Sequence, residues 1–511
     1  MKITIIGSGV SGLTAAAYLS GEGHEVTVYE QNTDVGGVTS GLQREGFHWD
    51  MGQRILEGFA HGEQVGTIID ELGIRDRLQM NRQDRVYVFP DFRMEKPEEY
   101  GGPWWRKEQL QNLFPEDRKG LERYYRYYVR FMELITMARR AERSVGIMSI
   151  WYKLRLFMKL VPFIPKIKWN ADRMMKHFFS SQKLQAAFIS ILADFTVRPS
   201  QFPGLGVAAV NPEPAFDRRV PLKVSLSGSQ PSYQFIEGGC RSLVDALVTL
   251  IKENGATIRT GITVESIDIV DKRVQGVVLS DGSRQTADIV MASGGAKETF
   301  FNIAGREHFP ADFVKSIETV PLMESIFMVH IGIDFDPTPW QKSGVTYYYR
   351  TYDIEKGVDD IMRGHYHQGE DGLLICIPSL YSEGMSPEGT HAVTVYTIAP
   401  DTLQEGSWED RKEAYADRLL EIAEEYVPGL REHTLVLEVL TPDDFKRITH
   451  LQHHAFGGCA PVMGRKGAPH QTPVDGLYFM GAQSESGAGI NNVMEGAWRA
   501  VRLVRKYAAT P

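Results

Sequence analysis

Residues 3–12 read ITIIGSGVSG, and the chain that follows them, LTAAAYL, has small residues on its first turns. The apolar run predicts a short buried strand, and the segment after Gly12 predicts a helix. The G-x-G-x-x-G between them has a separate task for each glycine: a tight turn at Gly7, close approach of the backbone to a pyrophosphate at Gly9, and close helix packing at Gly12. The helix N-terminus adds free N–H groups and the positive end of its dipole. The segment therefore predicts a Rossmann-type dinucleotide-binding unit.

An acidic residue follows at the distance that this unit requires. Residues 25–29, EVTVY, predict a second strand, which ends at Glu30, 18 residues after Gly12. A carboxylate at this place accepts hydrogen bonds from ribose hydroxyls. It would repel a 2′-phosphate, so the cofactor is predicted to be FAD or NAD rather than NADP.

Four further segments place glycines beside predicted strands, turns or helices. Residues 34–40, DVGGVTS, place a second glycine pair where another backbone segment can close over the pyrophosphate, and residues 46–52, GFHWDMG, predict a short strand and a tight turn. Residues 237–243, EGGCRSL, precede a helix predicted for 244–253. A last block, residues 476–493, predicts a strand, a Gly-Ala turn and the start of a final helix over 494–506.

This order of motifs resembles the flavoprotein superfamily of amine oxidases and phytoene desaturases. It is most similar to the phytoene desaturase, carotenoid isomerase and retinol saturase-like branch, in which a Gly-Ala turn precedes a Gly-x-Gly helix start. The resemblance covers the whole chain and is concentrated in residues 3–54, 231–295 and 472–500, although Val38 stands where many members carry arginine. It implies non-covalent FAD. The expected cofactor-binding residues are Gly7, Gly9, Val10, Ser11, Gly12, Glu30, Gln31, Gly36, Gly37, Val38, Met51, Gly52, Val264, Ser293, Gly294, Gly481, Ala482, Gly489, Ile490, Asn491 and Val493.

We predict an α/β fold class in which a Rossmann-type FAD-binding domain is assembled from discontinuous segments. Its segments are residues 1–70, 231–296 and 456–511. Residues 71–230 and 297–455 then form an α+β substrate domain with a mixed or antiparallel sheet. Its helical part, about 120–200, includes a helix over 121–143, while 326–331 and 391–396 alternate like strands. The chain has one dinucleotide fingerprint, so a second Rossmann domain for NAD(P)H is not predicted.

Composition excludes several other classes of protein. The 511 residues carry a formal net charge of −9, which argues against nucleic acid as a main partner. The chain has three cysteines, Cys240, Cys376 and Cys459, and none of them forms a C-x-x-C pair. We therefore expect neither a disulfide scaffold nor a zinc ribbon, and we expect a reducing, cytoplasmic location. There is no G-x-S-x-G elbow, no P-loop and no run of about 18 apolar residues that would predict a membrane span.

One segment has a composition typical of membrane-surface helices. Residues 147–169, IMSIWYKLRLFMKLVPFIPKIKW, hold five basic residues and no acid, with apolar residues at helical spacing up to Pro162. Such a helix suits the surface of an anionic membrane. The alternative is a helix whose apolar face packs on the substrate domain with its lysines in solvent. The sequence leaves both interpretations open.

No catalytic acid or base stands out. Glu485 and His453 are the nearest candidates by sequence proximity to the flavin segments, and a structural role is the simpler interpretation of each. Gly457-Gly458-Cys459 is similar to the Gly-Gly-Cys at which some amine oxidases attach FAD covalently, but it lies only 22 residues before Gly481, and an inert packing cysteine is favoured. His450, His453 and His454 lack the further ligands that a metal would need, so no metal is predicted.

The predicted function is that of an FAD-dependent oxidoreductase acting on carbon–carbon bonds of an apolar isoprenoid or polyene lipid. Desaturation, saturation and isomerisation all stay open, as do the electron acceptor and the oligomeric state. An amine oxidase-like enzyme on a small substrate is one alternative. A flavin-bound interaction protein without turnover is another.

Overall fold

The computed structural model describes residues 1–52 and 56–509. Its N-terminal sheet contains five strands in the order β10-β2-β1-β14-β20, and every neighbouring pair is parallel. The strands are β1 (Lys2–Ile6), β2 (Glu25–Tyr29), β10 (Thr257–Arg259), β14 (Ile289–Ser293) and β20 (Leu477–Met480). Strands from three distant parts of the chain thus form one sheet, as predicted for a Rossmann-type unit built from discontinuous segments.

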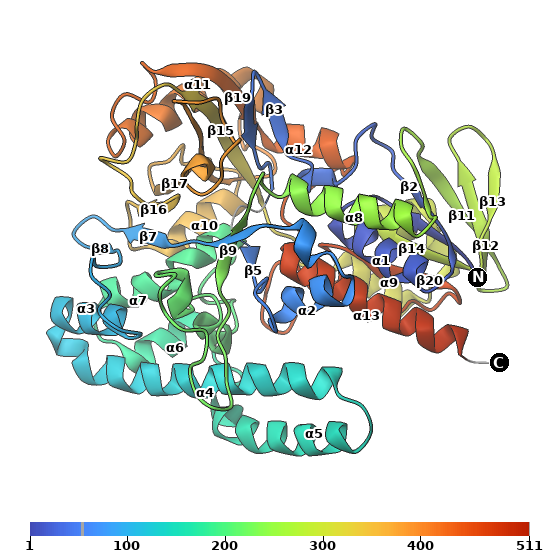
Figure 1. Cartoon of the computed structure of the whole chain (residues 1–511), viewed down its shortest axis with the longest axis horizontal. Coiled ribbons are helices and arrows are strands. Elements are labelled where there is room, and N and C mark those ends of the chain that lie inside the picture. Colours follow the sequence, from blue (N-terminus) through green and yellow to red (C-terminus); the bar gives the residue numbers. More distant parts are fainter. Residues whose placement is uncertain (53–55, 510–511) are drawn as a thin grey trace.

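Both faces of this parallel sheet are covered, which explains its nearly continuous apolar strands. One face packs on helices that share a single apolar core, and these are α1 (Val10–Gly21), α2 (Gln64–Glu71), α8 (Arg241–Glu253) and α13 (Ile490–Ala508). The other face packs on the three-stranded sheet β11 (Val264–Val270), β12 (Arg273–Leu279) and β13 (Arg284–Thr286), and on α9 (Ala311–Glu318). Figure 1 shows α1, α8 and α13 running side by side beside the N-terminus.

A second, seven-stranded sheet lies apart from the first in Figure 1. Its strand order is β19-β15-β18-β17-β16-β7-β8, and all neighbours are antiparallel except the parallel pair β16 and β7. The strands are β7 (Arg85–Val88), β8 (Arg93–Met94), β15 (Ser325–Ile333), β16 (Val345–Tyr349), β17 (Gly372–Cys376), β18 (His391–Ala399) and β19 (Thr434–Leu440). The predicted mixed sheet is confirmed.

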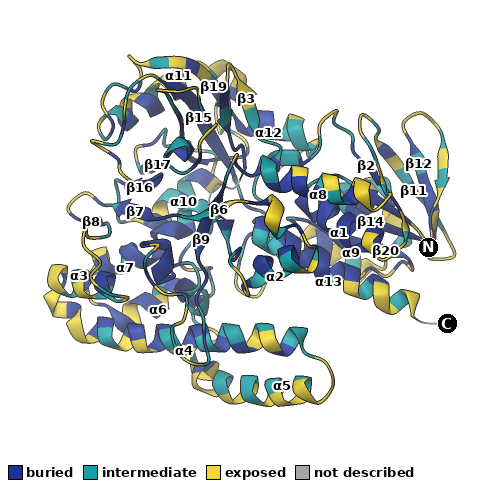
Figure 2. Ribbon diagram, in the orientation of Figure 1, coloured by how far each residue is buried: buried dark blue, intermediate teal, exposed yellow. Residues whose placement is uncertain are grey.

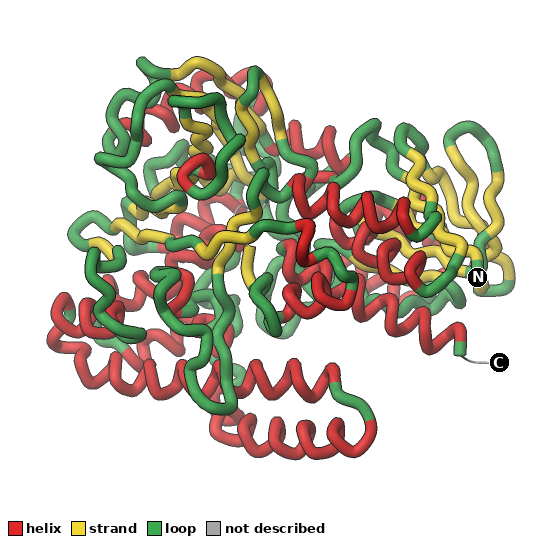
Figure 3. Tube along the Cα trace, viewed as in Figure 1, coloured by secondary structure: helices red, strands yellow, loops and turns green. Residues whose placement is uncertain are grey.

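The two faces of the seven-stranded sheet meet different partners. One face packs on α11 (Trp408–Glu424) through a core that includes Phe327, Val329 and Ile375. The other face joins a large aromatic core shared with the helices of the segment predicted as helical. These are α3 (Trp105–Leu113), α4 (Arg118–Arg143), α6 (Ala171–Phe178) and α7 (Gln182–Ile189). Figure 3 shows this helical part as a separate group below the strands.

Short strands connect the two parts. β5 (Leu56–Glu57) and β6 (Met80–Arg82) both pair with β9 (Tyr233–Ile236), and β3 (Leu42–Arg44) pairs with β4 (Phe47–Trp49). The remaining helices are α5 (Gly146–Leu160), α10 (Ile354–Met362) and α12 (Pro442–Thr449). No described helix is long and apolar enough to cross a membrane.

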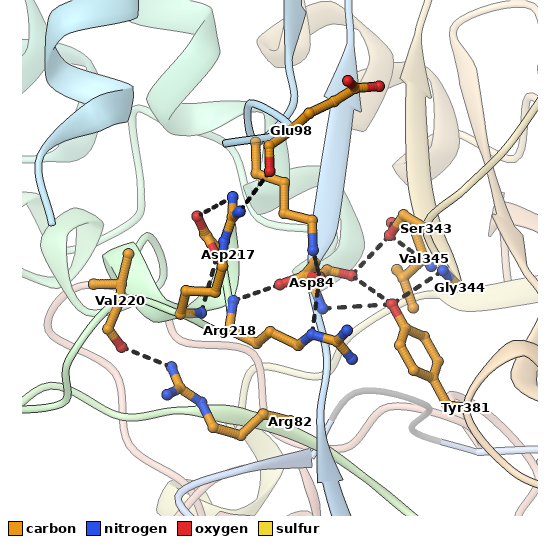
Figure 4. A network of polar contacts seen from close by, with 12 residues as sticks. Arg82, Asp84, Glu98, Asp217, Arg218, Val220, Ser343, Gly344, Val345 and Tyr381 are labelled. Carbon is orange, nitrogen blue, oxygen red and sulfur yellow. Dashed lines mark hydrogen bonds and ion pairs between the residues drawn. The ribbon is translucent and has the colours of Figure 1, made fainter. Parts of the chain in front are cut away.

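Asp84 holds the start of β7 in place through a polar network (Figure 4). Its carboxylate accepts hydrogen bonds from Lys96 Nζ at 2.5 Å and from the backbone N–H of Arg218. Its carbonyl accepts from Ser343 Oγ at 2.8 Å and Tyr381 Oη at 3.4 Å. The network therefore joins β7 to the loop around residue 218 and to the segment before β16, and it fixes the edge of the seven-stranded sheet.

Two predicted boundaries were wrong, both at helix N-termini. The helix predicted for 244–253 begins at Arg241, and the helix predicted for 494–506 begins at Ile490. In each case the residues after a positive-φ glycine already have helical geometry, so the helix starts inside the motif that was expected to precede it. The helix over 121–143 and the strands over 326–331 and 391–396 are confirmed.

Candidate functional site

The two glycine pairs predicted to hold a pyrophosphate lie side by side. Gly9 and Gly36 form an isolated parallel bridge, and the Gly36 N–H donates to the Ser8 carbonyl at 3.1 Å. A Cβ on Gly37 would lie 3.9 Å from Gly9 Cα. At Gly12 a Cβ would lie 2.1 Å from the Gly7 carbonyl oxygen, so only glycine allows α1 to pack so close to the turn. At Gly9, in contrast, a Cβ would meet nothing within 4 Å.

The first turn of α1 has the features of an anion site. It begins directly after Gly9, carries no acidic residue, and leaves its first N–H groups outside the helical hydrogen bonds. The Ser11 hydroxyl is buried there without a hydrogen-bond partner among the described residues, whereas the Val10 side chain packs into the core. A buried hydroxyl without a partner costs free energy unless a ligand or water reaches it, so this cradle fits a bound phosphate group.

Glu30 is buried at the end of β2 and fixed from two sides. Its Oε2 accepts from the Ser8 N–H at 2.8 Å and the Ser8 hydroxyl at 2.7 Å, and its Oε1 accepts from the Asn32 N–H at 2.9 Å. A carboxylate offers about four acceptor positions. Among donors of the described residues, these three leave one position on Oε1 for a ribose hydroxyl, which is the role predicted for this residue.

The carboxyl ends of β1, β14 and β20 lie close together. Ser293 Oγ donates to the Ile6 carbonyl at 3.0 Å, and a Cβ on Gly7 would lie 2.8 Å from the Ser293 carbonyl. A Cβ on Gly481 would lie 3.5 Å from the Gly294 nitrogen. The Ala482 carbonyl accepts from the Cys459 N–H at 2.8 Å. These predicted residues, from three distant segments, therefore lie together at the carboxyl edge of the parallel sheet, where ligands of such sheets bind.

Val38, Met51 and Gly52 also lie together. A Cβ on Gly52 would lie 2.8 Å from the Val38 carbonyl, and Met51 and Val38 share an apolar cluster with Met328 of β15. The Gly36–Val38 turn therefore contacts the seven-stranded sheet.

The start of α13 places its predicted residues in two environments. The side chains of Ile490 and Val493 are buried in the same core as α1. Asn491 is partly exposed, and Gly489 has φ 96° at the N-cap. The first turn carries no acid. Free N–H groups at a helix start stabilise negative charge on a nearby ligand.

Two further predicted residues, Val264 and Gln31, lie near Glu30. The Ile262 N–H, two residues before the buried Val264, donates to the Glu30 carbonyl at 3.0 Å. Gln31 donates from Nε2 to the Thr449 carbonyl at 3.2 Å. The Gln31 side chain is thus occupied by the end of α12.

Neither weak catalytic candidate has a setting typical of an acid or base. Glu485 is exposed and accepts from the His470 N–H at 3.0 Å. His453 lies with Nδ1 3.0 Å from Asp401 Oδ2, and its side chain is 68% exposed. Asp401 also accepts from the His454 N–H at 2.7 Å. Each candidate thus anchors a loop, and the described residues contain no group of three or more possible metal ligands among His, Cys, Asp and Glu.

Three residues that support the cradle were not predicted. Ser8 bridges Glu30 to the second glycine pair, Asp50 Oδ1 accepts from the Cys240 N–H at 2.8 Å, and Gln483 Oε1 accepts from the Ala296 N–H at 2.8 Å. Asp50 and Gln483 link segments that are far apart in the chain, whereas Ser8 links loops within the first 36 residues. A sequence signal exists only for Asp50, which lies between the predicted strand and Met51-Gly52.

An apolar row crosses the seven-stranded sheet from the Met51 cluster. Met328 lies opposite Tyr396, Tyr396 opposite Leu374, Leu374 opposite Tyr347, and Tyr347 opposite Tyr87. Opposed residues on neighbouring strands share a face. From Met328 to Tyr347 the row spans three strand spacings, about 14 Å. Met328, Leu374, Tyr347 and Tyr87 are buried, so the row is an apolar stripe in the interior that begins beside Val38 and Met51.

Comparison with known proteins agrees with this architecture. The family model described as flavin containing amine oxidoreductase matches residues 10–505. A 4,4′-diapophytoene desaturase (4,4′-diaponeurosporene-forming) of Staphylococcus aureus is 26% identical over 522 residues, which cover 97% of each chain. An oxidoreductase from Methanosarcina mazei has a similar structure, with a TM-score of 0.64, 20% identity, and coverage of 98% of this chain and 100% of that one. Putrescine oxidase bound to putrescine has a TM-score of 0.61 at 14% identity, covering 99% of each chain.

Proposed function

The chain belongs to the flavin containing amine oxidoreductase family, and from that premise we propose that this FAD-dependent oxidoreductase acts on carbon–carbon bonds of an apolar isoprenoid or polyene lipid. The observation that carries the substrate class is the apolar row from Met328 to Tyr87, which begins beside the predicted flavin contacts Val38 and Met51. A substrate beside these residues would meet apolar side chains, which suits an isoprenoid chain better than a small polar molecule. The similarity to a diapophytoene desaturase over nearly the whole chain supports the same class.

FAD would be held by residues that fit its parts. Gly9, Gly36 and the first turn of α1 would contact the pyrophosphate, with the Ser11 hydroxyl as a donor, and Glu30 would accept from the ribose. The start of α13 would lie at the flavin ring. When bound, the flavin supplies hydride exchange with a substrate carbon. The protein binds and orients the substrate along the apolar row and excludes water.

Cys459 is proposed not to bond to the flavin. Burial raises the pKa of its thiol to about 11, and its Sγ–H faces the Ala460 carbonyl at 3.8 Å. The thiolate is the reactive form of cysteine, so at neutral pH this thiol is unreactive. We expect acid precipitation to release all flavin into the supernatant from the wild-type protein and from Cys459→Ala alike. Flavin absorbance retained in the wild-type pellet, and lost in the variant, would contradict this.

The activity is tested by anaerobic mixing. The purified yellow protein is mixed with NADH, NADPH, a panel of polyenes and a panel of amines, each separately, while the flavin absorbance is followed. Bleaching by polyenes and not by amines is expected for a desaturase. Bleaching by NADH or NADPH would instead indicate a saturase or an isomerase that uses reduced flavin.

The alternatives have their own signatures in the same experiment. Bleaching by amines alone would favour an amine oxidase-like enzyme and contradict the proposal. Flavin that none of these donors reduces would favour an interaction protein without turnover.

We also propose that α5 contacts a membrane surface. No residue of α5, all of which the structure describes, is buried. Leu156 and Leu160 pack toward the aromatic core, while Ile147, Leu154 and Phe157 are between 59% and 82% exposed. Figure 2 shows the helix in yellow and teal along its length. The alternative from sequence, an apolar face packed on the protein with lysines in solvent, does not fit these exposures.

The charges beside this apolar face partly support the same contact. Lys153 is exposed, and Arg155 lies over the Trp151 ring at 4.6 Å, which leaves both cations near the apolar surface. Lys159 differs, because its Nζ lies 2.7 Å from a Glu133 carboxylate oxygen. Lys159 is therefore a structural residue rather than a lipid contact.

A further inference from the structure

A short hairpin over residues 221–230 ends in an exposed leucine. Its two arms meet in an isolated antiparallel bridge between Lys223 and Ser229. Leu226 lies between these arms and is fully exposed, more than any other large hydrophobic residue that the structure describes. Val224, in contrast, packs against the aromatic core. Single exposed hydrophobic residues are common on protein surfaces, so the meaning of Leu226 depends on what lies beside it.

The base of the hairpin is fixed on α4. The Ser229 N–H donates to Thr136 Oγ1 at 2.9 Å, and the Tyr128 hydroxyl donates to Gln230 Oε1. A Cβ on Gly228 would lie 2.9 Å from the Cα of Glu133, so only glycine allows the hairpin to pack this close to the helix. The leucine is therefore presented on a rigid support.

The tip of the hairpin lies beside α5. Lys159 of α5 places its Nζ 2.7 Å from a Glu133 carboxylate oxygen and donates to Ser227 Oγ at 3.5 Å, directly after Leu226. In Figure 1 the green loop that leads to β9 descends past α4, and its lower end and α5 both reach the lower edge of the molecule. Residues 145–167 hold about half of the exposed large hydrophobic side chains of the described residues. Leu226 thus extends an existing apolar surface.

The charges of the hairpin match those of α5. Lys223 is exposed, and residues 221–231 contain no acid, as is also true of residues 144–171. Glu133, which lies between the two segments, is paired with Lys159. In a protein with a formal net charge of −9, an apolar surface with basic residues suits a bilayer that contains anionic lipid. A symmetric contact with a second copy would instead bring the same basic residues face to face.

The backbone around the tip is largely satisfied inside the hairpin. Ser225 Oγ accepts from the N–H groups of Ser227 at 3.3 Å and Gly228 at 3.1 Å. The N–H groups of Val224 and Ser225 donate to the Gly228 carbonyl at 3.3 and 3.4 Å. Backbone groups that leave water for a bilayer need such internal partners. The tip can therefore enter the membrane interface at a low cost in hydrogen bonds.

We propose that the tip of the 221–230 hairpin, with Leu226 at its end, inserts into an anionic membrane beside α5. A single helix on a bilayer is free to roll about its own axis, and a second contact away from that axis fixes the orientation of the whole protein. The inference extends the proposed contact of α5 and rests on the proposed function, in which the substrate is an apolar lipid.

The first test is a fluorescent label at the tip. The three native cysteines are all buried, so the thiol of Leu226→Cys reacts selectively with an environment-sensitive NBD reagent. On mixing of the labelled, flavin-loaded protein with vesicles of phosphatidylglycerol and phosphatidylcholine, we expect the NBD emission to increase and shift to shorter wavelength, because the probe leaves water. Emission that the vesicles leave unchanged would overturn the inference.

The matched control for the label is Val270→Cys. Val270 is an exposed apolar residue at the end of β11, where the turn to β12 begins, so it also lies at a hairpin tip. Its NBD emission should be the same with and without vesicles. An equal shift at both positions would show adsorption without orientation and would also overturn the inference.

The second test removes the leucine. Half of the burial of one leucine side chain corresponds to about 3- to 10-fold in partitioning, so Leu226→Ser should weaken co-sedimentation with the same vesicles by this factor. Because Leu226 is fully exposed, thermal unfolding and flavin content should not change. Val270→Ser should bind vesicles like the wild type. Wild-type partitioning of Leu226→Ser would contradict insertion of the tip.

A label on α5 separates the inference from the proposed function. A shift at Leu154→Cys without one at Leu226→Cys overturns the hairpin insertion and leaves the α5 contact standing. A shift at Leu226→Cys alone supports the hairpin insertion and contradicts the α5 contact. A shift that appears without vesicles and grows with protein concentration would indicate a second copy at the tip and overturn the inference. Flavin bleaching by polyenes reports on the proposed reaction independently of these labels.

Discussion

Gly9→Ala is expected to weaken FAD binding by about 5- to 150-fold while leaving the stability of the flavin-free protein unchanged. Gly9 has φ −58°, which alanine adopts freely, and its Cβ would meet no protein atom within 4 Å. If the pyrophosphate lies against this residue, the added methyl group overpacks the complex alone, at a cost of about 1–3 kcal/mol. Flavin affinity by fluorescence titration and thermal unfolding of the apoprotein measure the two effects separately.

Two other glycines of the same segment serve as controls. Gly12→Ala should destabilise the apoprotein itself, because its Cβ would lie 2.1 Å from the Gly7 carbonyl. Gly21→Ala, at the end of α1, should be nearly neutral, because its Cβ would lie 3.4 Å from the flexible Asn254 side chain. Wild-type flavin affinity in Gly9→Ala would show that the pyrophosphate is not held at this turn.

Replacing Ile147, Leu154 and Phe157 of α5 together by serine is expected to reduce partitioning onto anionic liposomes by at least about 30-fold. Full burial of one such side chain contributes about 1.5–3 kcal/mol, and even half of that for three residues exceeds about 2 kcal/mol. All three are exposed, so the fold should be retained. Co-sedimentation with vesicles measures the change.

The matched control replaces three exposed apolar side chains elsewhere. Val270, Leu435 and Leu437 are between 44% and 56% exposed and lie outside α5, so their replacement by serine should leave liposome binding intact.

Lys153→Glu with Arg155→Glu should abolish the preference for anionic over neutral vesicles, and Lys159 is kept because it pairs with Glu133. Vesicle binding that is unaffected by the α5 serines would contradict the membrane contact.

The parts of the fold that were predictable are those with local signals. The G-x-G-x-x-G over residues 7–12, the strand ending at Glu30 and the alternation over 391–396 each have a spacing that requires a particular backbone geometry. Helix starts were less predictable, as at Arg241 and Ile490, because the glycine turns before them continue directly into helical geometry.

The candidate site was predictable only in part, because some of its residues have no local signal in the sequence. Gly36, Ser293 and Gly481 each follow a recognisable strand or turn, and the structure brings them together. Ser8 and Gln483 have no local signal, since their function depends on a partner hundreds of residues away or on another loop. Glu485 and His453 were candidates only because they lie near the flavin segments in sequence. In the structure Glu485 accepts a hydrogen bond from a loop backbone N–H, and His453 contacts Asp401, which anchors a loop.

The sequence by itself determined the Rossmann-type unit, the class of cofactor and the position of an apolar, basic helix at residues 147–160. Tertiary structure alone decided which face of that helix is exposed, and that Met328, Tyr396 and Tyr347 align across four strands. The physical reason is the range of the interactions. Turn geometry and helix periodicity act within a few residues, whereas burial and strand register depend on segments that meet only after the chain has folded.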